Sequence, residues 1–154
     1  MSKVLIQKAV QKDFFPVSDA AVATGWLPGQ VATLGATGQY INLITAGATG
    51  GPSNVAMFVL GDDDTEVVTP PSGSLATVYY GAGTKLVIDH STEVKLGSAT
   101  RAYNASLESA SAGMPVYLDT AGKFSATSSG SVMGMLFQVP AAVNNYGAGI
   151  ITRF

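Results

Sequence analysis

The sequence predicts an all-β protein, a small β-barrel or sandwich built from short hairpins, with an extended N-terminal arm and at most one short helix. Short runs rich in Val, Ile, Leu and Tyr recur along the 154 residues. Turn signals rich in Gly, Pro, Asn and Asp separate them at roughly 8–12-residue spacing, which is typical of sandwiches and barrels. Stretches with the apolar period of an amphipathic helix are scarce.

The first half of the chain supplies several candidate strands. Residues 31–35 and 38–45 are joined by Ala-Thr-Gly, and we expect them to form a hairpin. Residues 54–61 form a near-continuous apolar run of strand length, and 65–69 form a second run that ends at two prolines. Residues 74–81 and 84–90 flank a Gly-Ala-Gly turn and are a further hairpin candidate. Val94 and Leu96 alternate with polar neighbours, which indicates a strand with one buried face.

The second half contains the sequence GMPVYLDTAGKF, residues 113–124. Two interpretations are open: a loop that positions Asp119 and Lys123 for chemistry, or two strands joined by a wet turn. Because residues 114–119 and 123–128 are short runs joined by Thr-Ala-Gly, we predict a hairpin. Residues 131–140 and 147–154 add two more strands. Between 100 and 113, the i, i+4, i+7 spacing indicates a short helix with one apolar face, formed by Tyr103, Leu107 and Ala110.

A chain of this length is expected to form one domain with a proper core. We assign residues 1–24 to an N-terminal arm and residues 25–154 to a single β-barrel domain. Phe14 and Phe15 lie in the arm, and two adjacent aromatic residues cannot both face inward on an extended strand. They are therefore candidate interface residues that dock on a neighbouring protein. Trp26 is a third candidate, with the domain's own core as the alternative.

Charged residues make up only 12% of the chain, and their distribution is uneven. Residues 20–61, 67–84 and 124–152 contain no Asp, Glu, Lys or Arg. Depletion of charge is a property of interface cores, so much of the surface is expected to lie against other protein. The alternative is a β-domain covered by neutral Thr, Ser and Gly. A net charge of −2 argues against a nucleic-acid partner.

Several classes of protein are excluded by what the sequence lacks. It has no cysteine, so disulfide frameworks and thiolate zinc sites are excluded. The N-terminal residues carry scattered charges without the apolar core of a signal peptide. No apolar run is long enough to span a membrane as a helix. We therefore expect synthesis and assembly in a cytosol, and no membrane partner.

Two groups of residues are candidates for a metal site or a catalytic site. Asp62, Asp64 and Glu66 alternate in the one dense acidic cluster, where they are weak candidates for a Ca²⁺ or Mg²⁺ site; a solvated turn is the alternative. His90 lies between Asp89 and Ser91, but adjacent strand residues point to opposite faces and cannot converge as a triad. We expect no catalytic residues, no cofactor and no enzymatic activity.

A family resemblance rests mainly on residues 113–138. In that segment a G-x-P-V strand leads through an Asp-containing turn to a G-K-apolar strand and then to a strand with an internal glycine. The matching residues are Gly113, Pro115, Val116, Asp119, Gly122, Lys123, Phe124 and Gly134. Residues 25–39 are similar in style, with Pro28, Gly29 and Val31 before a Gly-rich turn. The chain thus resembles the small β-barrel decoration, or cement, proteins of tailed-bacteriophage heads.

The resemblance implies a structural virion protein that binds the outer face of the phage capsid, clamps neighbouring major capsid subunits and stabilises the head. It implies a homo-oligomer, a dimer or a trimer, located on the capsid exterior and in the host cytoplasm during assembly. Two other functions stay open. One is a tail-tube or other virion ring protein, and the other, of a different class, is a carbohydrate-binding or hydrolytic β-domain with Tyr79 and Tyr80 near Asp89.

Overall fold

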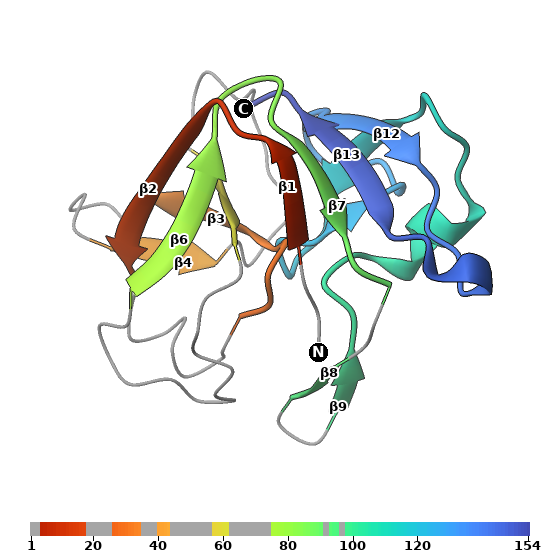
Figure 1. Cartoon of the computed structure of the whole chain (residues 1–154), viewed down its shortest axis with the longest axis horizontal. Helices are drawn as coiled ribbons and strands as arrows, with labels where there is room; N and C mark the ends of the chain where they lie inside the picture. The colour runs from red at the N-terminus through yellow and green to blue at the C-terminus, as the bar shows by residue number, and fades with distance from the viewer. Residues whose placement is uncertain are drawn as a thin grey trace.

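The structure is a computed structural model that describes residues 4–17, 26–34, 40–43, 57–61, 75–90, 93–95 and 98–154. These residues form two antiparallel sheets of six and five strands and a separate pair of strands (Figure 1). The predicted all-β class is confirmed. The two sheets are not closed into a barrel, so the architecture is that of a sandwich.

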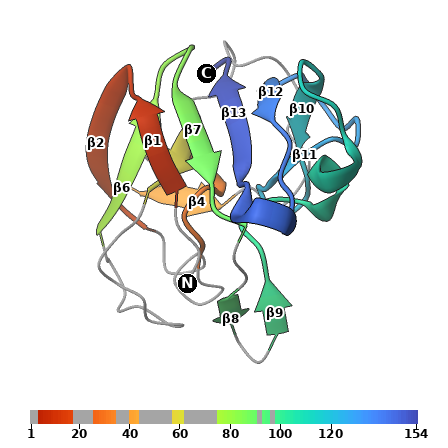
Figure 2. The ribbon, with the colours of Figure 1, turned by 45° about the vertical axis from the view of Figure 1, so that its right-hand side comes forward.

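The larger sheet has the strand order β1-β7-β13-β12-β10-β11. Most of it is visible as one curved layer in Figure 2. Its strands are β1 (Val4–Lys8), β7 (Lys85–Ile88), β10 (Pro115–Leu118), β11 (Phe124–Ser125), β12 (Gly134–Gln138) and β13 (Ala148–Thr152).

The smaller sheet has the order β2-β6-β5-β3-β4, and β8 pairs only with β9. These strands are β2 (Gln11–Pro16), β3 (Val31–Leu34), β4 (Ile41–Leu43), β5 (Met57–Leu60), β6 (Leu75–Tyr80), β8 (Glu93–Lys95) and β9 (Ser98–Thr100). Among the described residues the only helices are two 3-10 turns, η1 (Ala105–Ser109) and η2 (Val143–Asn145). The predicted short helix within 100–113 is thus a 3-10 turn.

Two of the predicted hairpins are confirmed. β3 pairs with β4 in antiparallel register, and β10 pairs with β11 across the turn that contains Asp119. The predicted strands at 131–140 and 147–154 correspond to β12 and β13, which pair with each other. The predicted strand at 65–69 lies outside the described residues.

The predicted hairpin of residues 74–90 is wrong. β6 pairs with β2 and β5 in one sheet, whereas β7 pairs with β1 and β13 in the other. Gly81 and Gly83 have φ values of +103° and +95°, conformations that glycine adopts without a steric penalty. The Gly-Ala-Gly segment therefore carries the chain from one sheet to the other instead of folding it back on itself.

The predicted N-terminal arm is also wrong for the residues that the structure describes. Val4–Lys8 forms β1 on β7, and Gln11–Pro16 forms β2 on β6, so this segment contributes an edge strand to each sheet. Val4 and Val17, near its two ends, are buried. Only one side chain in two faces the core along most of the segment, so the adjacent Phe14 and Phe15, which cannot both face inward on a strand, made the segment resemble a docking arm. Residues 18–24 lie outside the described residues.

The core consists of two clusters of apolar side chains. The first lies between the sheets and brings residues such as Leu86 and Ile150 of the larger sheet against Val31 and Val59 of the smaller one. Tyr103 and Leu107 of the η1 region join this cluster. The second covers the opposite face of the smaller sheet and includes Phe58, Leu60, Ala76 and Val78. The smaller sheet therefore buries side chains on both faces, which explains the continuous apolar run in β5.

Candidate interaction surface

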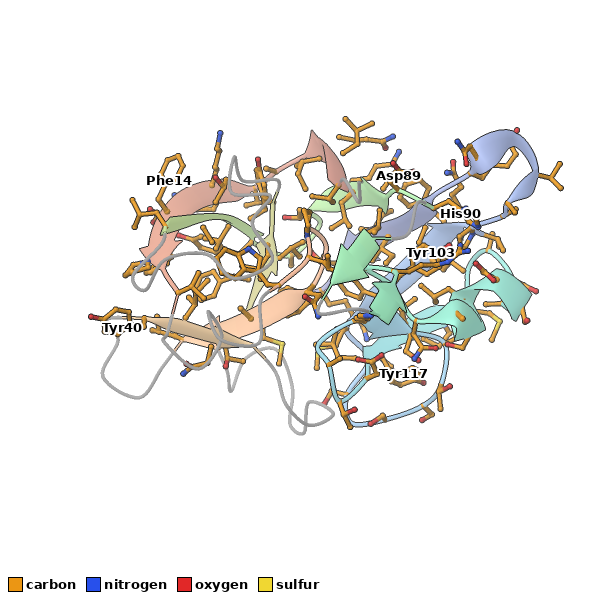
Figure 3. All side chains as sticks on the ribbon, turned by 90° about the horizontal axis from the view of Figure 1, so that it is seen from below. Phe14, Tyr40, Asp89, His90, Tyr103 and Tyr117 are labelled. Atoms are coloured by element: carbon orange, nitrogen blue, oxygen red, sulfur yellow. The ribbon has the colours of Figure 1, made fainter. Side chains whose placement is uncertain are left out.

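The three predicted interface residues lie in different environments. Alternation along β2 places Phe14 outward, with 58% of its surface exposed, and turns Phe15 toward the second core cluster. The Phe15 ring packs on Phe58 with a centroid separation of 5.2 Å. Trp26 is half-buried against the same cluster. Phe14 is thus the one of the three whose ring is mainly presented to solvent, as Figure 3 shows at one end of the molecule.

Phe14 belongs to a small apolar patch on β2 and β6. The register sets Phe14 opposite Thr77 and Pro16 opposite Leu75, so Phe14, Pro16 and Leu75 share one face; we call these three residues the β2 patch. Leu75 is 61% exposed. The Lys12 ammonium lies 5.8 Å from the centre of the Phe14 ring, a cation–π distance.

The edge of β2 that faces away from β6 is poorly suited to accept another strand, and Val17, the residue after it, already forms a bridge with Ile41 of β4. The Phe14 N–H donates to the Asp13 carboxylate over 2.8 Å, and Pro16, two residues on, has no N–H to donate. In a strand, amides two residues apart point to the same side. Two consecutive donor positions on this edge are therefore occupied or missing, which blocks sheet extension. A partner at this edge would contact side chains and not the backbone.

A second apolar area lies on the outer face of the larger sheet. Because Val4 and Ile6 contact the core, Leu5 faces outward, and the registers continue from it across the sheet. We call these outward residues the outer-face stripe: Leu5, Val87, Ile151, Met135 and Pro115. Leu5 is 62% and Met135 is 41% exposed. Lys85 provides a charge at this face, where its ammonium lies 4.7 Å from the centre of the Phe137 ring.

The turn at Asp119 is built to hold the β10–β11 hairpin. One carboxylate oxygen accepts hydrogen bonds from the N–H groups of Ala121, over 2.8 Å, and Lys123, over 3.0 Å. The other accepts from the Asn104 amide over 3.0 Å. Burial lowers the pKa of Lys123, and the Asp119 charge opposes that shift. Of the two interpretations of this stretch, the structural turn is the one observed.

A polar cluster that sequence reasoning missed surrounds His90. Its Nε2 contacts the Arg101 guanidinium and lies 3.5 Å from the Glu108 carboxylate. Arg101 Nη1 also donates to Glu108, over 2.9 Å, and to the Tyr103 hydroxyl, over 3.1 Å. The Tyr103 hydroxyl in turn donates to the same Glu108 oxygen over 3.1 Å. We call His90, Arg101, Tyr103 and Glu108 the His90 cluster; His90 and Tyr103 lie side by side in Figure 3.

The remaining site candidate from the sequence is the acidic cluster. Asp62, Asp64 and Glu66 lie outside the described residues. Within the described ranges, no group of three or more His, Asp or Glu side chains is arranged to hold a metal ion. Neither 3-10 turn in that part of the chain is a long apolar helix of the kind that crosses a membrane.

No family model matches this chain, and no curated protein or solved structure matches it either.

Proposed function

We propose that the chain is a structural virion protein, a decoration or cement protein that binds the outer face of a tailed-phage head and clamps neighbouring major capsid subunits. The observation that carries the proposal is the exposed apolar surface on a sandwich with few charged side chains. The β2 patch and the outer-face stripe both consist of large apolar residues held on paired strands. Surfaces of this kind are typical of contacts between proteins.

The energetics of such surfaces fit a clamp. Full burial of one Phe, Leu or Met side chain contributes about 1.5–3 kcal/mol. Phe14, Leu75 and Leu5 keep more than half of their surface exposed, so a partner can bury most of each side chain. A protein that binds only the assembled lattice stabilises that lattice by mass action. As a dimer or trimer it would touch several capsid subunits at once and gain further through effective concentration.

The β2 edge, which is poorly suited to accept another strand, determines how the proposed contact forms. Capture of a capsid strand by backbone pairing is disfavoured there, because Asp13 occupies the Phe14 N–H and Pro16 has none. The proposed contact instead inserts the Phe14 ring, beside Leu75, into an apolar pocket of the capsid subunit. Aromatic anchors of this type dominate the energetics of many interfaces.

The test is co-sedimentation of the purified protein with expanded capsids that lack it. We expect saturable binding, and we expect Phe14→Gln combined with Leu75→Gln to weaken it at least tenfold. Val143→Gln is the matched control, because Val143 is 74% exposed and lies on η2, outside both apolar surfaces. Equal binding by the double variant and the control would contradict the role of the β2 patch.

The same preparation separates the other two functions. Growth into tubes without capsids would favour a tail-tube or ring protein. Retention on a glycan array would favour a carbohydrate-binding domain. Failure to bind capsids, together with either of these results, would overturn the decoration proposal.

A further inference from the structure

Three cationic side chains belong to one end of the larger sheet. Because β1 and β13 run antiparallel to β7, the end of β1, the start of β7 and the end of β13 lie side by side, as Figure 2 shows. Lys8 of β1 pairs with Lys85 of β7, and Arg153 is the residue directly after β13. We call Lys8, Lys85 and Arg153 the basic cluster.

All three side chains are on the outer face of the sheet. Leu86 is fully buried in the core, so alternation along β7 turns Lys85 outward, and its pairing partner Lys8 shares that face. Arg153 is exposed between two buried neighbours. Ile151 of the outer-face stripe pairs with Lys85. The basic cluster and the outer-face stripe therefore form one continuous surface.

The basic cluster has no acidic partner within the described part of the chain. The ion pairs found there both involve Glu108, which lies on η1. The strands of the larger sheet contain no Asp or Glu. Lys85 places its ammonium against the Phe137 ring, and Lys8 lies directly opposite Lys85, an arrangement of like charges that destabilises a sheet. The described residues thus provide no carboxylate that compensates this cost.

The chemistry of this face indicates the kind of partner that it fits. The outer-face stripe provides apolar side chains, of which Leu5 is 62% and Met135 is 41% exposed, and the basic cluster adds positive charges beside them. Electrostatic complementarity requires negative charges opposite such a cluster. A nucleic acid would meet few cations and a broad apolar surface, on a chain whose net charge is −2. A protein segment that carries both carboxylates and apolar side chains fits both parts.

A second copy of this chain fits this face less well. In a two-fold contact the face would meet itself. Among the described residues of the larger sheet and its turns, alternation places two acidic residues on this side, Asp89 after β7 and Asp119 after β10. The Asp119 carboxylate is already bonded within its own turn. A second copy would therefore bring few carboxylates against the basic cluster.

We propose that the outer face of the larger sheet is a second capsid contact, which binds an acidic and partly apolar segment of a major capsid subunit. This inference rests on the proposed function and extends it. The carboxylates of the segment lie against the basic cluster, and its apolar side chains cover the outer-face stripe. The β2 patch belongs to the smaller sheet and the new contact to the larger one, so one copy holds two neighbouring subunits, one at each surface.

Co-sedimentation with expanded capsids measures the contribution of the basic cluster. Lys8→Gln and Arg153→Gln each remove one positive charge, and each should weaken binding by about threefold or more. Lys95→Gln is the matched control, because it changes the net charge equally and lies on β8, outside both sheets. Raised salt should weaken the binding of the wild type more than that of the Lys8→Gln, Arg153→Gln double variant. Cluster variants that bind as tightly as the control would overturn the inference.

A carbodiimide cross-linker tests the chemistry of the partner on the unmodified protein. It condenses a lysine ammonium with a carboxylate and takes up the water that is released, so it joins only groups in direct contact. Mass spectrometry of the cross-linked complex should show Lys8 or Lys85 joined to Asp or Glu of the major capsid subunit. Links from these lysines to another copy of this chain, or capsid links confined to other lysines, would overturn the inference even if a variant failed to fold.

The outcomes separate this contact from the proposed function. A wild-type protein that does not sediment with capsids refutes both. Saturable binding that is weakened by the Phe14→Gln, Leu75→Gln double variant, and not by the basic-cluster variants, refutes only the second contact. Binding of the wild type to double-stranded DNA that is lost in Lys8→Gln would assign the basic cluster to a nucleic acid and also refute the second contact.

Discussion

Val10 lies directly against Gly81 at the corner where two neighbouring segments pass from one sheet to the other. A Cβ on Gly81 would be only 2.5 Å from the Val10 Cβ, so the approach of the two backbones requires glycine. On one side of the corner β1 pairs with β7, and on the other side β2 pairs with β6. Two adjacent segments that change sheet together join the sheets into a single folded unit.

Substitution of Gly81 by Ala should be strongly destabilising. The residue has φ of +103°, and the new methyl group would collide with Val10. Strain and collision together should lower the free energy of unfolding by about 2–5 kcal/mol, measured by urea denaturation. Gly83→Ala is the control, because Gly83 has a similar φ of +95° but nothing within 4 Å of the added Cβ. It should lose only about 1–2 kcal/mol, and equal losses in the two variants would contradict the close contact at the corner.

Deletion of residues 1–16 should abolish the folded state, because it removes the edge strand of both sheets together with the buried Val4 side chain. The expected result is loss of the cooperative thermal transition and of the near-UV circular dichroism signal. Deletion of residues 1–3 removes no part of β1 and should preserve both. A folded 17–154 fragment would show that the segment is an arm after all.

Asp119→Ala should destabilise the β10–β11 turn. It leaves the N–H groups of Ala121 and Lys123 and the Asn104 amide without their acceptor. Loss of these bonds should lower the free energy of unfolding by about 1.5–3 kcal/mol. Asp119→Asn keeps an oxygen for the two backbone donors and should lose less. Urea denaturation of the three proteins measures the order, and an Asn variant as unstable as the Ala variant would count against the capping role.

Tyr103 should make stability decrease at alkaline pH. Burial raises its pKa in the folded chain, with the Arg101 hydrogen bond acting in the opposite direction. Because the folded state holds the proton more tightly, the contribution is complete below the ordinary tyrosine value of 10.0 and is lost as pH rises above it. Tyr103→Phe removes this titration. It should be less stable than the wild type by about 1 kcal/mol at neutral pH, from the lost hydrogen bonds.

The measurement is the urea unfolding free energy of the wild type and of Tyr103→Phe at about pH 8 and pH 11. The difference between the two proteins should shrink at the higher pH, because the phenol of the unfolded wild type then ionises while the buried phenol of the folded state keeps its proton, and this favours unfolding. Other groups titrate in both proteins and cancel in the comparison. A difference of the same size at both values would indicate that Tyr103 does not ionise on unfolding.

The features of the fold that were correctly predicted from the sequence are pairings between strands that are close together in the chain. The β3–β4 and β10–β11 hairpins join strands close together in the chain, where turn residues such as Asp119 and Gly122 carry the signal. The Gly81–Gly83 segment has the same residue types, yet it leads to another sheet. The strand that follows it, β7, pairs with β1 and β13, which are distant in the sequence, and local composition contains no information about them.

The candidate sites likewise differ in whether neighbouring residues in the sequence could reveal them. Alternation along β2 correctly separates Phe14 from Phe15, because it depends only on neighbouring residues. The His90 cluster could not be predicted, since Arg101, Tyr103 and Glu108 reach His90 only through the 3-10 turn and the pairing of β8 with β9. Of the three, only Glu108 lies in η1, and a 3-10 turn does not follow the period of an α-helix, so their spacing gave no signal.

The central claim is that the apolar exterior of this sandwich is an association surface for a capsid. It is tested most directly by equilibrium co-sedimentation of the wild-type protein with expanded heads that lack it. Saturation at a fixed ratio to the major capsid subunits, with increased resistance of the heads to heat, is the predicted result. A protein that stays in the supernatant as a monomer at every concentration would contradict it.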